Sequence, residues 1–417
     1  MEGHPYAKRL FEDEFNLVAE LTRMNVAPRD ILAIIKERNL SNVSTLRTIY
    51  NARNKIRMVD QIGKSPMQVL LSLLHSNGYV YEITTTGLNE LENLFFIHPT
   101  SFDIWRAFPH VLIIDVTYKT NHYNMPFLEV VGVTSTSKTF SIAFAFMHNE
   151  KIVNYTWVLN CLKLTLDQCM LPRVIVTDRE MALMNACKEV FRDAAHLFCR
   201  WHIEQNLFRR CRQSFRSVKA WEEFLLLWKS LENSTTLESY TENYRQLETL
   251  LIKHPRVLAY VNESWLNDYK ERFVSVWIDQ HLNFGNNTTN RVESQHAKLK
   301  KYLDGSNSSL DRFLRCIDRI VTSQQITIKE SLENQYVSLD SIDIFWKKLD
   351  ISPLVSFQND DVSYDDELLL FKEYFKKQSK DGQKSWLRKL KDILFPGKTD
   401  IQEPQVQKKK KLVDDQA

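Results

Sequence analysis

The sequence predicts an α/β protein in which a β-rich segment is combined with helical segments. Residues 111–116 form a nearly continuous apolar run, which is typical of a strand buried on both faces. Two further β-type runs cover residues 127–134 and 140–147, and a polar turn separates them. Residues 201–282, in contrast, have a helical pattern that is rich in aromatic side chains. These observations predict a sheet whose chain is interrupted by an all-α segment.

The order of the predicted elements defines the fold more closely. A helix through residues 154–166 follows the three strands, and Asn154 is its expected N-cap. A fourth strand (173–177), a helix (180–190) and a short fifth strand (194–198) come next. The order β-β-β-α-β-α-β is that of the ribonuclease H-like fold.

Composition and polar breaks divide the chain into six predicted parts. Three short helices begin the chain; Pro28 suits a first helical turn, and together they resemble a helix-turn-helix unit. The first predicted part is a helical domain (1–60), which either binds DNA or is a helical bundle with a solvated basic face. The other parts are a connecting region (61–108), the first part of the core (109–216), an all-α insertion (217–284), the second part of the core with the Glu293 helix (285–335), and a mostly helical C-terminal region with a basic tail (336–417).

The overall composition excludes several classes of protein. The chain has 417 residues and 43% hydrophobic content, which is enough for a soluble globular protein with a large core. The net charge of +3 does not by itself indicate nucleic-acid binding, so that function requires local basic patches. Six cysteines without regular spacing predict free thiols in a reducing compartment. Without a signal peptide or a run of about 18 apolar residues, we expect a cytosolic or nuclear protein with no membrane association.

Three acidic residues stand where a metal site would require them. Asp115 closes the first strand, Asp178 follows the fourth, and Glu293 lies near the start of a later helix. The two strands are neighbours in a ribonuclease H-like sheet, so the two aspartates are expected to lie close together. Phosphodiester cleavage uses two divalent cations about 4 Å apart that share carboxylates. Because Mg²⁺ prefers oxygen ligands, this set predicts a nuclease-type site for two Mg²⁺ or Mn²⁺ ions.

Each acidic residue also has a local structural explanation. Asp115 could simply begin a turn, and Asp178 could cap a helix that starts at Arg179. Glu293 could belong to a capping box, with Asn290 as the N-cap. The combination of the three residues with the strand order favours the metal site over these alternatives.

The segment Cys199-Arg-Trp-His202 directly follows the fifth strand. One Cys-x-x-His pair supplies at most half of a tetrahedral zinc site, and the sequence offers no matching second pair nearby. Zinc is therefore not expected. The pair is instead predicted to support the strand-to-helix junction, with His202 able to hydrogen-bond a carboxylate or a phosphate.

Basic residues gather around these motifs. Local clusters can bind DNA even at a small net charge, because phosphate neutralisation dominates DNA affinity; the alternative is an ordinary solvated helix face. The candidate DNA-binding residues are Arg53, Lys55, Arg57, Arg200, Arg209, Arg210, Arg291, Lys298, Lys300 and Lys301.

Taken in order, four motifs resemble the transposases of Mutator-like elements and their far-red-impaired-response relatives in plants. They are Asp115-Val-Thr-Tyr-Lys-Thr-Asn121, Thr177-Asp-Arg-Glu180, Cys199-Arg-Trp-His202 and Asn290-Arg-Val-Glu-Ser-Gln-His296. The resemblance covers roughly residues 105–305. It does not extend to the family's zinc-binding domains, because no Cys/His spacing of that kind precedes residue 105 and Cys316 is the last cysteine.

The resemblance implies a ribonuclease H-like DDE core and cut-and-paste transposition of DNA. By position, Asp115, Asp178 and Glu293 would be catalytic metal ligands for Mg²⁺ or Mn²⁺, supported by Cys199 and His202. The implied partners are double-stranded DNA, as transposon ends and target, and further copies of the chain; the implied location is the nucleus. Two alternatives stay open: a domesticated or inactive relative that binds DNA and regulates transcription, and an α/β nuclease of another lineage.

Overall fold

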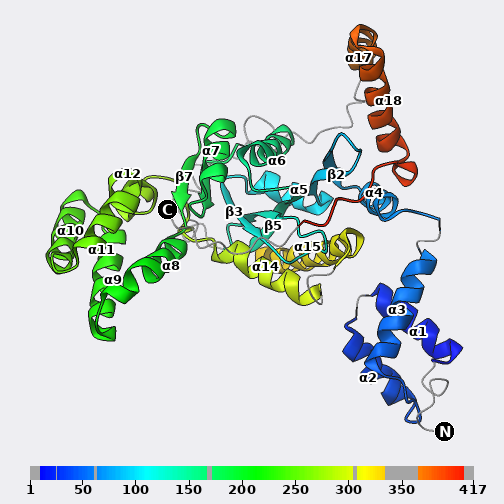
Figure 1. Ribbon diagram of the computed structural model, residues 1–417, viewed down its shortest axis with the longest axis horizontal. Helices are drawn as coiled ribbons and strands as arrows, with labels where there is room; N and C mark the ends of the chain where they lie inside the picture. The colour runs from blue at the N-terminus through cyan, green and yellow to red at the C-terminus, as the bar shows by residue number, and fades with distance from the viewer. Residues whose placement is uncertain are drawn as a thin grey trace. The chain divides into compact units, whose positions relative to one another are not determined.

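The computed structural model describes residues 10–24, 26–60, 63–166, 171–303, 308–333 and 365–407 (Figure 1). The chain divides into two compact units, Met1–Val69 and Leu70–Ala417. Among the helices in the described ranges, none is both long enough and apolar enough to cross a membrane.

The first unit contains three helices around a small core of its own. They are α1 (Glu12–Arg23), α2 (Pro28–Arg38) and α3 (Leu46–Asp60). Pro28 is the first residue of α2, as the sequence predicts. Apolar side chains at helical spacing meet between the helices, and the core consists of Val18, Ala19, Ile31, Ile35, Ile49, Ala52 and Ile56. The Arg57 side chain lies outside the described part of the chain.

The second unit is a mixed α/β domain built on one seven-stranded sheet. The strand order is β1-β2-β5-β4-β3-β6-β7. The strands are β1 (Val80–Thr85), β2 (Leu91–Ile97), β3 (Val111–Thr117), β4 (Phe127–Val133), β5 (Thr139–Phe146), β6 (Val174–Thr177) and β7 (Ala195–Phe198). Neighbours from β1 to β3 are antiparallel, whereas β6 and β7 run parallel to β3. The five strands predicted between residues 111 and 198 are confirmed.

Most of the predicted connecting region, residues 61–108, falls in the second unit, which begins at Leu70. This region contains helix α4 (Pro66–Ser76), strands β1 and β2, and helix α5 (Pro99–Ala107). β2 pairs with β5 and so extends the sheet by two strands. The sequence prediction missed β2 because two polar residues interrupt its apolar run, Leu-Glu-Asn-Leu-Phe-Phe-Ile. The first of them, Glu92, is half-buried, and the second, Asn93, is buried.

Helices cover both faces of the sheet because its strands are apolar on both sides. Leu112 and Ile114 of β3 pack with α6 (Ile152–Leu164) and α7 (Met181–Val190). Val111 and Ile113 point to the opposite face, where they meet Val292 of α14 (Asn290–Tyr302). Figure 1 shows α6 and α7 on one side of the sheet, with α14 and α15 (Leu310–Glu333) on the other. By strand alternation, Asp115 belongs to the α14 face.

The start of α6 corrects one detail of the sequence prediction. Its N-cap is Lys151, and Asn154 lies inside the first turn. The Asn154 side chain is buried, donates to the Asn149 carbonyl at 3.0 Å and accepts from Asn93 at 3.3 Å. Asn154 therefore ties the helix to the sheet instead of capping it.

A helical segment lies between β7 and α14. It consists of α8 (Arg200–Cys211), α9 (Val218–Glu232), α10 (Leu237–Leu251), α11 (Pro255–Val261), α12 (Asn267–Tyr269) and α13 (Ser275–Ile278), with short 3₁₀ and π turns between them. Its aromatic-rich core includes Trp221, Trp228 and Trp265. Ile203 and Leu207 of α8 belong to the same core, so the segment begins near residue 200, earlier than the predicted boundary at 217. Arg179 joins it to the sheet by donating to the Ser264 carbonyl at 2.8 Å.

The C-terminal region is described only from residue 365 to residue 407. Helices α17 (Asp365–Lys377) and α18 (Lys380–Leu394) form the predicted helical part. Beyond them, the Gln402 carbonyl accepts from the Leu91 amide at 3.0 Å, which brings the end of the described chain to the start of β2. The lysines of the predicted basic tail, residues 408–411, lie outside the described residues, as does Cys169. The other five cysteines are buried free thiols.

Candidate metal and nucleic-acid site

Strand pairing brings three carboxylates together at one end of the sheet. Asp115 lies directly opposite Glu129 in the antiparallel β3–β4 pair. On the other side of β3, Ile113 lies opposite Val176 in the parallel β3–β6 pair. Asp115 comes two residues after Ile113, and Asp178 comes two residues after Val176. The same register, continued past the end of β6, therefore places Asp178 beside Asp115. Since Asp115 is a paired residue inside a strand, the alternative that it begins a turn is wrong.

The electrostatic environment of Asp178 fits a cation site. Burial, the neighbouring Asp115 carboxylate and the acidic groups of Glu180 and Glu150 raise the pKa of Asp178 to about 7. The Glu180 amide opposes this shift by hydrogen-bonding the Asp178 carboxylate. Carboxylates that destabilise one another's charge in this way are stabilised by a bound cation. The acidic pair therefore has the donor set and the charge that Mg²⁺ or Mn²⁺ requires.

Helix α7 removes the alternative explanation of Asp178. Its first residue is Met181, and its N-cap is Glu180, whose carboxylate accepts from the Leu183 amide at 2.6 Å. Asp178 is therefore not the cap of this helix. Its carboxylate instead lies at the end of the sheet, near Asp115.

Two acidic residues near Asp178 were missed by the sequence analysis. Glu150 hydrogen-bonds Tyr118, and this contact together with burial raises the pKa of the Tyr118 hydroxyl. Glu180 caps α7 but also acts on the charge of Asp178. Glu180 stood in the sequence motif that contains Asp178, so its proximity was detectable. Glu150 follows β5 in a loop, and no local pattern connects it with the site.

His296 of α14 lies between two of the carboxylates. Its Nδ1 is 3.3 Å from Asp115 Oδ2, and its Nε2 is 3.4 Å from Glu129 Oε2. The Nε2 contact lacks the geometry of a hydrogen bond. The imidazole and the Glu129 side chain are almost fully buried, at 5% and 2% exposed. His296 therefore connects the helix on this face to both carboxylates.

The Glu129 carboxylate has polar support from a second helix. It accepts from Ser141 Oγ at 2.7 Å, and Ser141 in turn contacts Gln324 of α15. Burial raises the pKa of Glu129, and the nearby His296 partly opposes that shift. A glutamate inside the otherwise apolar β4 run was a visible signal, because a buried charge requires such partners.

Glu293 lies one turn before His296, and its contacts lead away from the aspartates. Its Oε1 accepts from the Thr289 hydroxyl at 2.9 Å and is 3.8 Å from His202 Nε2. The capping-box explanation is wrong, because Thr289, not Asn290, is the N-cap and Glu293 is the fourth helical residue. That Glu293 joins Asp115 and Asp178 stays a prediction.

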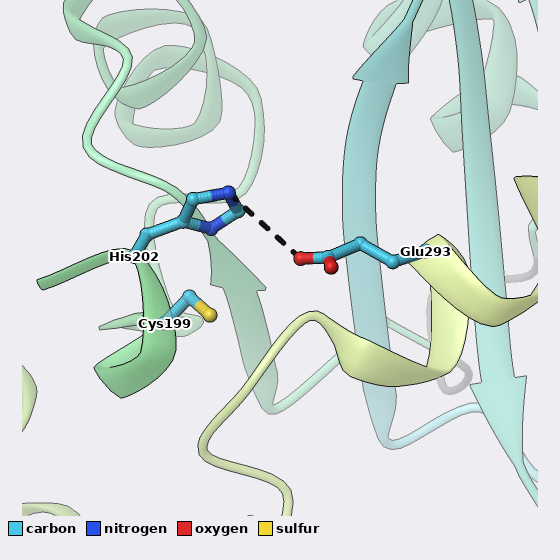
Figure 2. A group of neighbouring side chains, drawn as sticks. All are labelled: Cys199, His202 and Glu293. Atoms are coloured by element: carbon cyan, nitrogen blue, oxygen red, sulfur yellow. Dashed lines mark ion pairs between the residues drawn. The ribbon is translucent and has the colours of Figure 1, made fainter. Parts of the chain in front are cut away.

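The Cys-x-x-His step lies where it was expected, at the junction of β7 and α8. Cys199 is the N-cap of α8 and His202 lies in its first turn. Figure 2 shows both side chains facing Glu293 of α14. The Cys199 sulfur, a ring nitrogen of His202 and a carboxylate oxygen of Glu293 lie within 4.8 Å of one another. A carboxylate therefore lies beside His202, as expected, but at 3.8 Å Glu293 is beyond hydrogen-bond distance, and the His202 ring instead contacts the Thr289 hydroxyl at 3.2 Å.

The candidate DNA-binding residues separate into two groups. Arg200 is a correction: its guanidinium donates to Phe273, Asn233, Glu232 and Ser275 inside the helical segment. Arg291 is also engaged, with Asn286, Ser137 and Thr139. Both arginines hold elements together and are not presented to a ligand. The side chains of Lys55, Arg209, Arg210, Lys300 and Lys301 are exposed, and those of Arg53 and Lys298 are half-buried.

Lys300 is placed closest to the acidic pair among these cations. Its ammonium group hydrogen-bonds the Thr117 hydroxyl, two residues after Asp115. Burial lowers the pKa of Lys300, and the Asp115 carboxylate partly opposes that shift. Lys300 is therefore a cation at the edge of the acidic site.

Comparison with known proteins identifies the class of this domain. Residues 111–206, which include Asp115, Asp178, Cys199 and His202, match the MULE transposase domain. The resemblance predicted from the motifs is therefore confirmed over this part of the chain.

The relatives include plant proteins of the far-red-impaired-response group. The chain is 23% identical over 337 residues to FAR1-RELATED SEQUENCE 5 of Arabidopsis thaliana, covering 78% of this chain and 41% of the relative. It is 24% identical over 241 residues to FAR-RED IMPAIRED RESPONSE 1 of the same plant, covering 57% and 28%. A PKS-NRPS hybrid synthetase of Chaetomium globosum matches 74% of this chain at 24% identity, over only 7% of its own length. The chain thus spans less than half of each relative.

Among solved structures, the catalytic core domain of HTLV-2 integrase in complex with magnesium covers 40% of this chain and 96% of its own. The identity is 12% and the TM-score is 0.16, so this match does not contribute to the fold assignment.

Proposed function

We propose that this chain is a Mutator-like DDE transposase that cleaves DNA phosphodiesters at transposon ends and transfers the strands to a target. The observation that carries the proposal is that β3, which contains Asp115, pairs with β6, which Asp178 directly follows, and that burial and the Asp115 charge raise the pKa of Asp178 to about 7. A site of this kind favours divalent cations, and the matched MULE domain gives the reaction class.

The sheet supports a ribonuclease H-like core for this function. Three antiparallel strands, β5, β4 and β3, are followed by β6 and β7 in parallel, which is the order expected of that fold. The helical segment from α8 to α13 corresponds to an all-α insertion before the helix that carries Glu293. Asp115, Asp178 and Glu293 then form the catalytic set, with Glu293 as its least constrained member.

The residues present fit two Mg²⁺ or Mn²⁺ ions. Asp115 and Asp178 offer hard oxygen ligands, and Glu293 would complete the set from α14. When bound, such ions activate the attacking oxygen and stabilise the leaving oxygen. His296 contacts the Asp115 carboxylate and also the buried Glu129, which lies opposite Asp115 on β4. Lys300 adds a positive charge beside Asp115 for a DNA phosphate.

The partners and location follow from the same proposal. The nucleic acid is double-stranded DNA, as element ends and as target, and the exposed Arg209, Lys300 and Lys301 are suited to its phosphates. Two ends must be processed together, which favours a homo-oligomer by analogy with other transposases. The place of action is the nucleus.

The test is cleavage and strand transfer on DNA that carries the element's own ends, in Mg²⁺. We expect activity from the wild type and none from Asp115→Asn or Asp178→Asn, and a strong loss from Glu293→Gln. Glu222→Gln, which changes an exposed carboxylate of the helical segment, serves as the matched control and should retain activity. Activity that survives both aspartate changes would refute the assignment.

The second candidate is a transposase-derived DNA-binding protein that regulates transcription without cutting DNA. The match to FAR-RED IMPAIRED RESPONSE 1 favours it, because that relative is named for a response and not for transposition. The presence of all three carboxylates favours the enzyme. DNA binding without metal-dependent cleavage, on authentic element ends, would support the regulator.

A further inference from the structure

Three side chains with metal-binding atoms converge at the two ends of the helical segment. The sulfur of Cys199, a ring nitrogen of His202 and a carboxylate oxygen of Glu293 lie within 4.8 Å of one another (Figure 2). Cys199 and His202 come from the start of α8, where the segment begins, and Glu293 comes from α14, which follows its end. The sequence showed only the first pair, because the third residue is brought in by the fold.

The exposure of the three side chains would admit an ion. Cys199 is fully buried, whereas the side chains of His202 and Glu293 are 27% and 31% exposed. One side of the group is therefore closed by protein, and the other is open to solvent. This is the arrangement of zinc sites that have three protein ligands and leave one position for water.

The hydroxyl of Thr289 lies within hydrogen-bond distance of all three side chains of the group. Its Oγ1 lies 3.1 Å from Cys199 Sγ, 3.2 Å from His202 Nδ1 and 2.9 Å from Glu293 Oε1. A hydroxyl has one hydrogen and can donate it to only one of these atoms. A cation bound by the other three groups would satisfy their lone pairs together.

Backbone amides from two helix starts point at the Cys199 sulfur, whose thiolate is the form that binds metals. The Thr289 amide donates to it at 3.1 Å, and the backbone amides of Trp201 and His202 also point at it from the helix N-terminus. These donors lower the pKa of Cys199, whereas burial raises it and prevails. A bound cation would supply positive charge that the neighbouring protein groups lack, and it would thereby stabilise the Cys199 thiolate.

We propose that Cys199, His202 and Glu293 bind one Zn²⁺ ion, with water as the fourth ligand. A thiolate, an imidazole and a carboxylate are all zinc ligands, whereas Mg²⁺ prefers oxygen ligands to sulfur. The ion would fasten the start of α8 to α14 and so fix the helical segment at both ends. This proposal reverses the expectation from sequence that zinc is not bound.

The site would also position the third carboxylate of the proposed catalytic set. Within the described chain, the side-chain contacts of Glu293 all involve Oε1. A carboxylate can bridge two ions through its two oxygens, so Oε2 is left for the ion held by Asp115 and Asp178. This last step rests on the proposed function, whereas zinc binding itself does not.

The experiment measures metal in the full-length protein without DNA. The protein is equilibrated with Zn²⁺ and unbound metal is removed. Elemental analysis by mass spectrometry should then measure one zinc ion per chain. Cys199→Ala and His202→Asn should reduce the zinc content at least tenfold. Cys211→Ala is the matched control, because Cys211 is a buried thiol at the other end of α8, and it should keep its zinc.

Substitution of Co²⁺ for Zn²⁺ in the wild type provides a second readout that needs no variant to fold. The expected result is a sulfur-to-cobalt charge-transfer band. A wild type without this band, or a Cys199→Ala protein that folds and retains full zinc, would overturn the proposal. Zinc binding without DNA cleavage would instead count against the proposed function alone.

Discussion

The two groups of candidate ligands in this protein differ in chemistry and in origin. Asp115 and Asp178 offer only oxygen atoms and come from adjacent strands of one sheet. Cys199, His202 and Glu293 offer sulfur, nitrogen and oxygen; the first two come from the start of α8, the first helix of the helical segment, and Glu293 comes from α14, which follows the segment. The first group suits a hard ion that takes part in chemistry, and the second suits zinc. If both proposals hold, the two sites would take different metals because their ligand atoms differ.

The largest expected effect comes from placing a soft ligand in the hard site. With Asp115→Cys, DNA cleavage in Mg²⁺ should fall on the order of 10³-fold, because a lost ligand costs several kcal/mol of transition-state stabilisation. Replacing Mg²⁺ with Mn²⁺ should restore about tenfold, since Mn²⁺ accepts sulfur more readily. Steady cleavage rates in each metal provide the measurement. Equal cleavage rates in Mg²⁺ for the wild type and Asp115→Cys would contradict the claim that Asp115 belongs to a site for a hard ion, distinct from the zinc site.

The second effect concerns the contact of His296 with the acidic group. His296→Asn removes the imidazole from between Asp115 and the buried Glu129. Breaking a buried pair of this kind costs about 3–5 kcal/mol, so the thermal unfolding temperature should drop by several degrees at pH 7. The added change Glu129→Gln should recover part of the loss, because a neutral amide tolerates burial better. Strictly additive losses in the double variant would show that the pair does not interact.

The third effect is a pH dependence that belongs to Asp178. Its pKa is raised from 3.8 to about 7 in the folded protein, so its stabilising contribution is full below pH 4 and is lost as the pH rises through 7. Without added metal, Asp178→Asn should therefore unfold at a higher temperature than wild type at pH 8, and the gap should close toward pH 4. Mn²⁺ should reduce the gap at pH 8 by stabilising wild type. Unfolding temperatures that run parallel at every pH would contradict the shift.

The smallest effect separates the two groups of basic residues. Arg209→Ala should weaken DNA binding modestly and reduce the slope of log K against log salt by about 0.9 for the lost phosphate contact. Arg200→Ala should instead lower the unfolding temperature, because its guanidinium bonds within the helical segment. Binding titrations at several salt concentrations distinguish them. A salt slope that changes for Arg200→Ala and not for Arg209→Ala would reverse this assignment.

The sequence was sufficient for the sheet site and insufficient for the helical one. Apolar runs that end in Asp115 and before Asp178 predicted both strands, and parallel pairing then requires the aspartates to be neighbours. In contrast, the approach of Glu293 to Cys199 depends on how the whole helical segment folds, and no local pattern encodes that. Arg200 was misjudged for a related reason: charge in a sequence does not reveal whether a guanidinium is already bonded within the protein.

The most direct test of the central claim is Mn²⁺ binding to zinc-loaded protein, measured by isothermal titration calorimetry without DNA. We expect Asp178→Asn to weaken Mn²⁺ binding at least tenfold, while Cys211→Ala, loaded in the same way, leaves it within about twofold of wild type. Mn²⁺ affinity that is unchanged in Asp178→Asn would contradict the claim that Asp115 and Asp178 form the divalent-cation site.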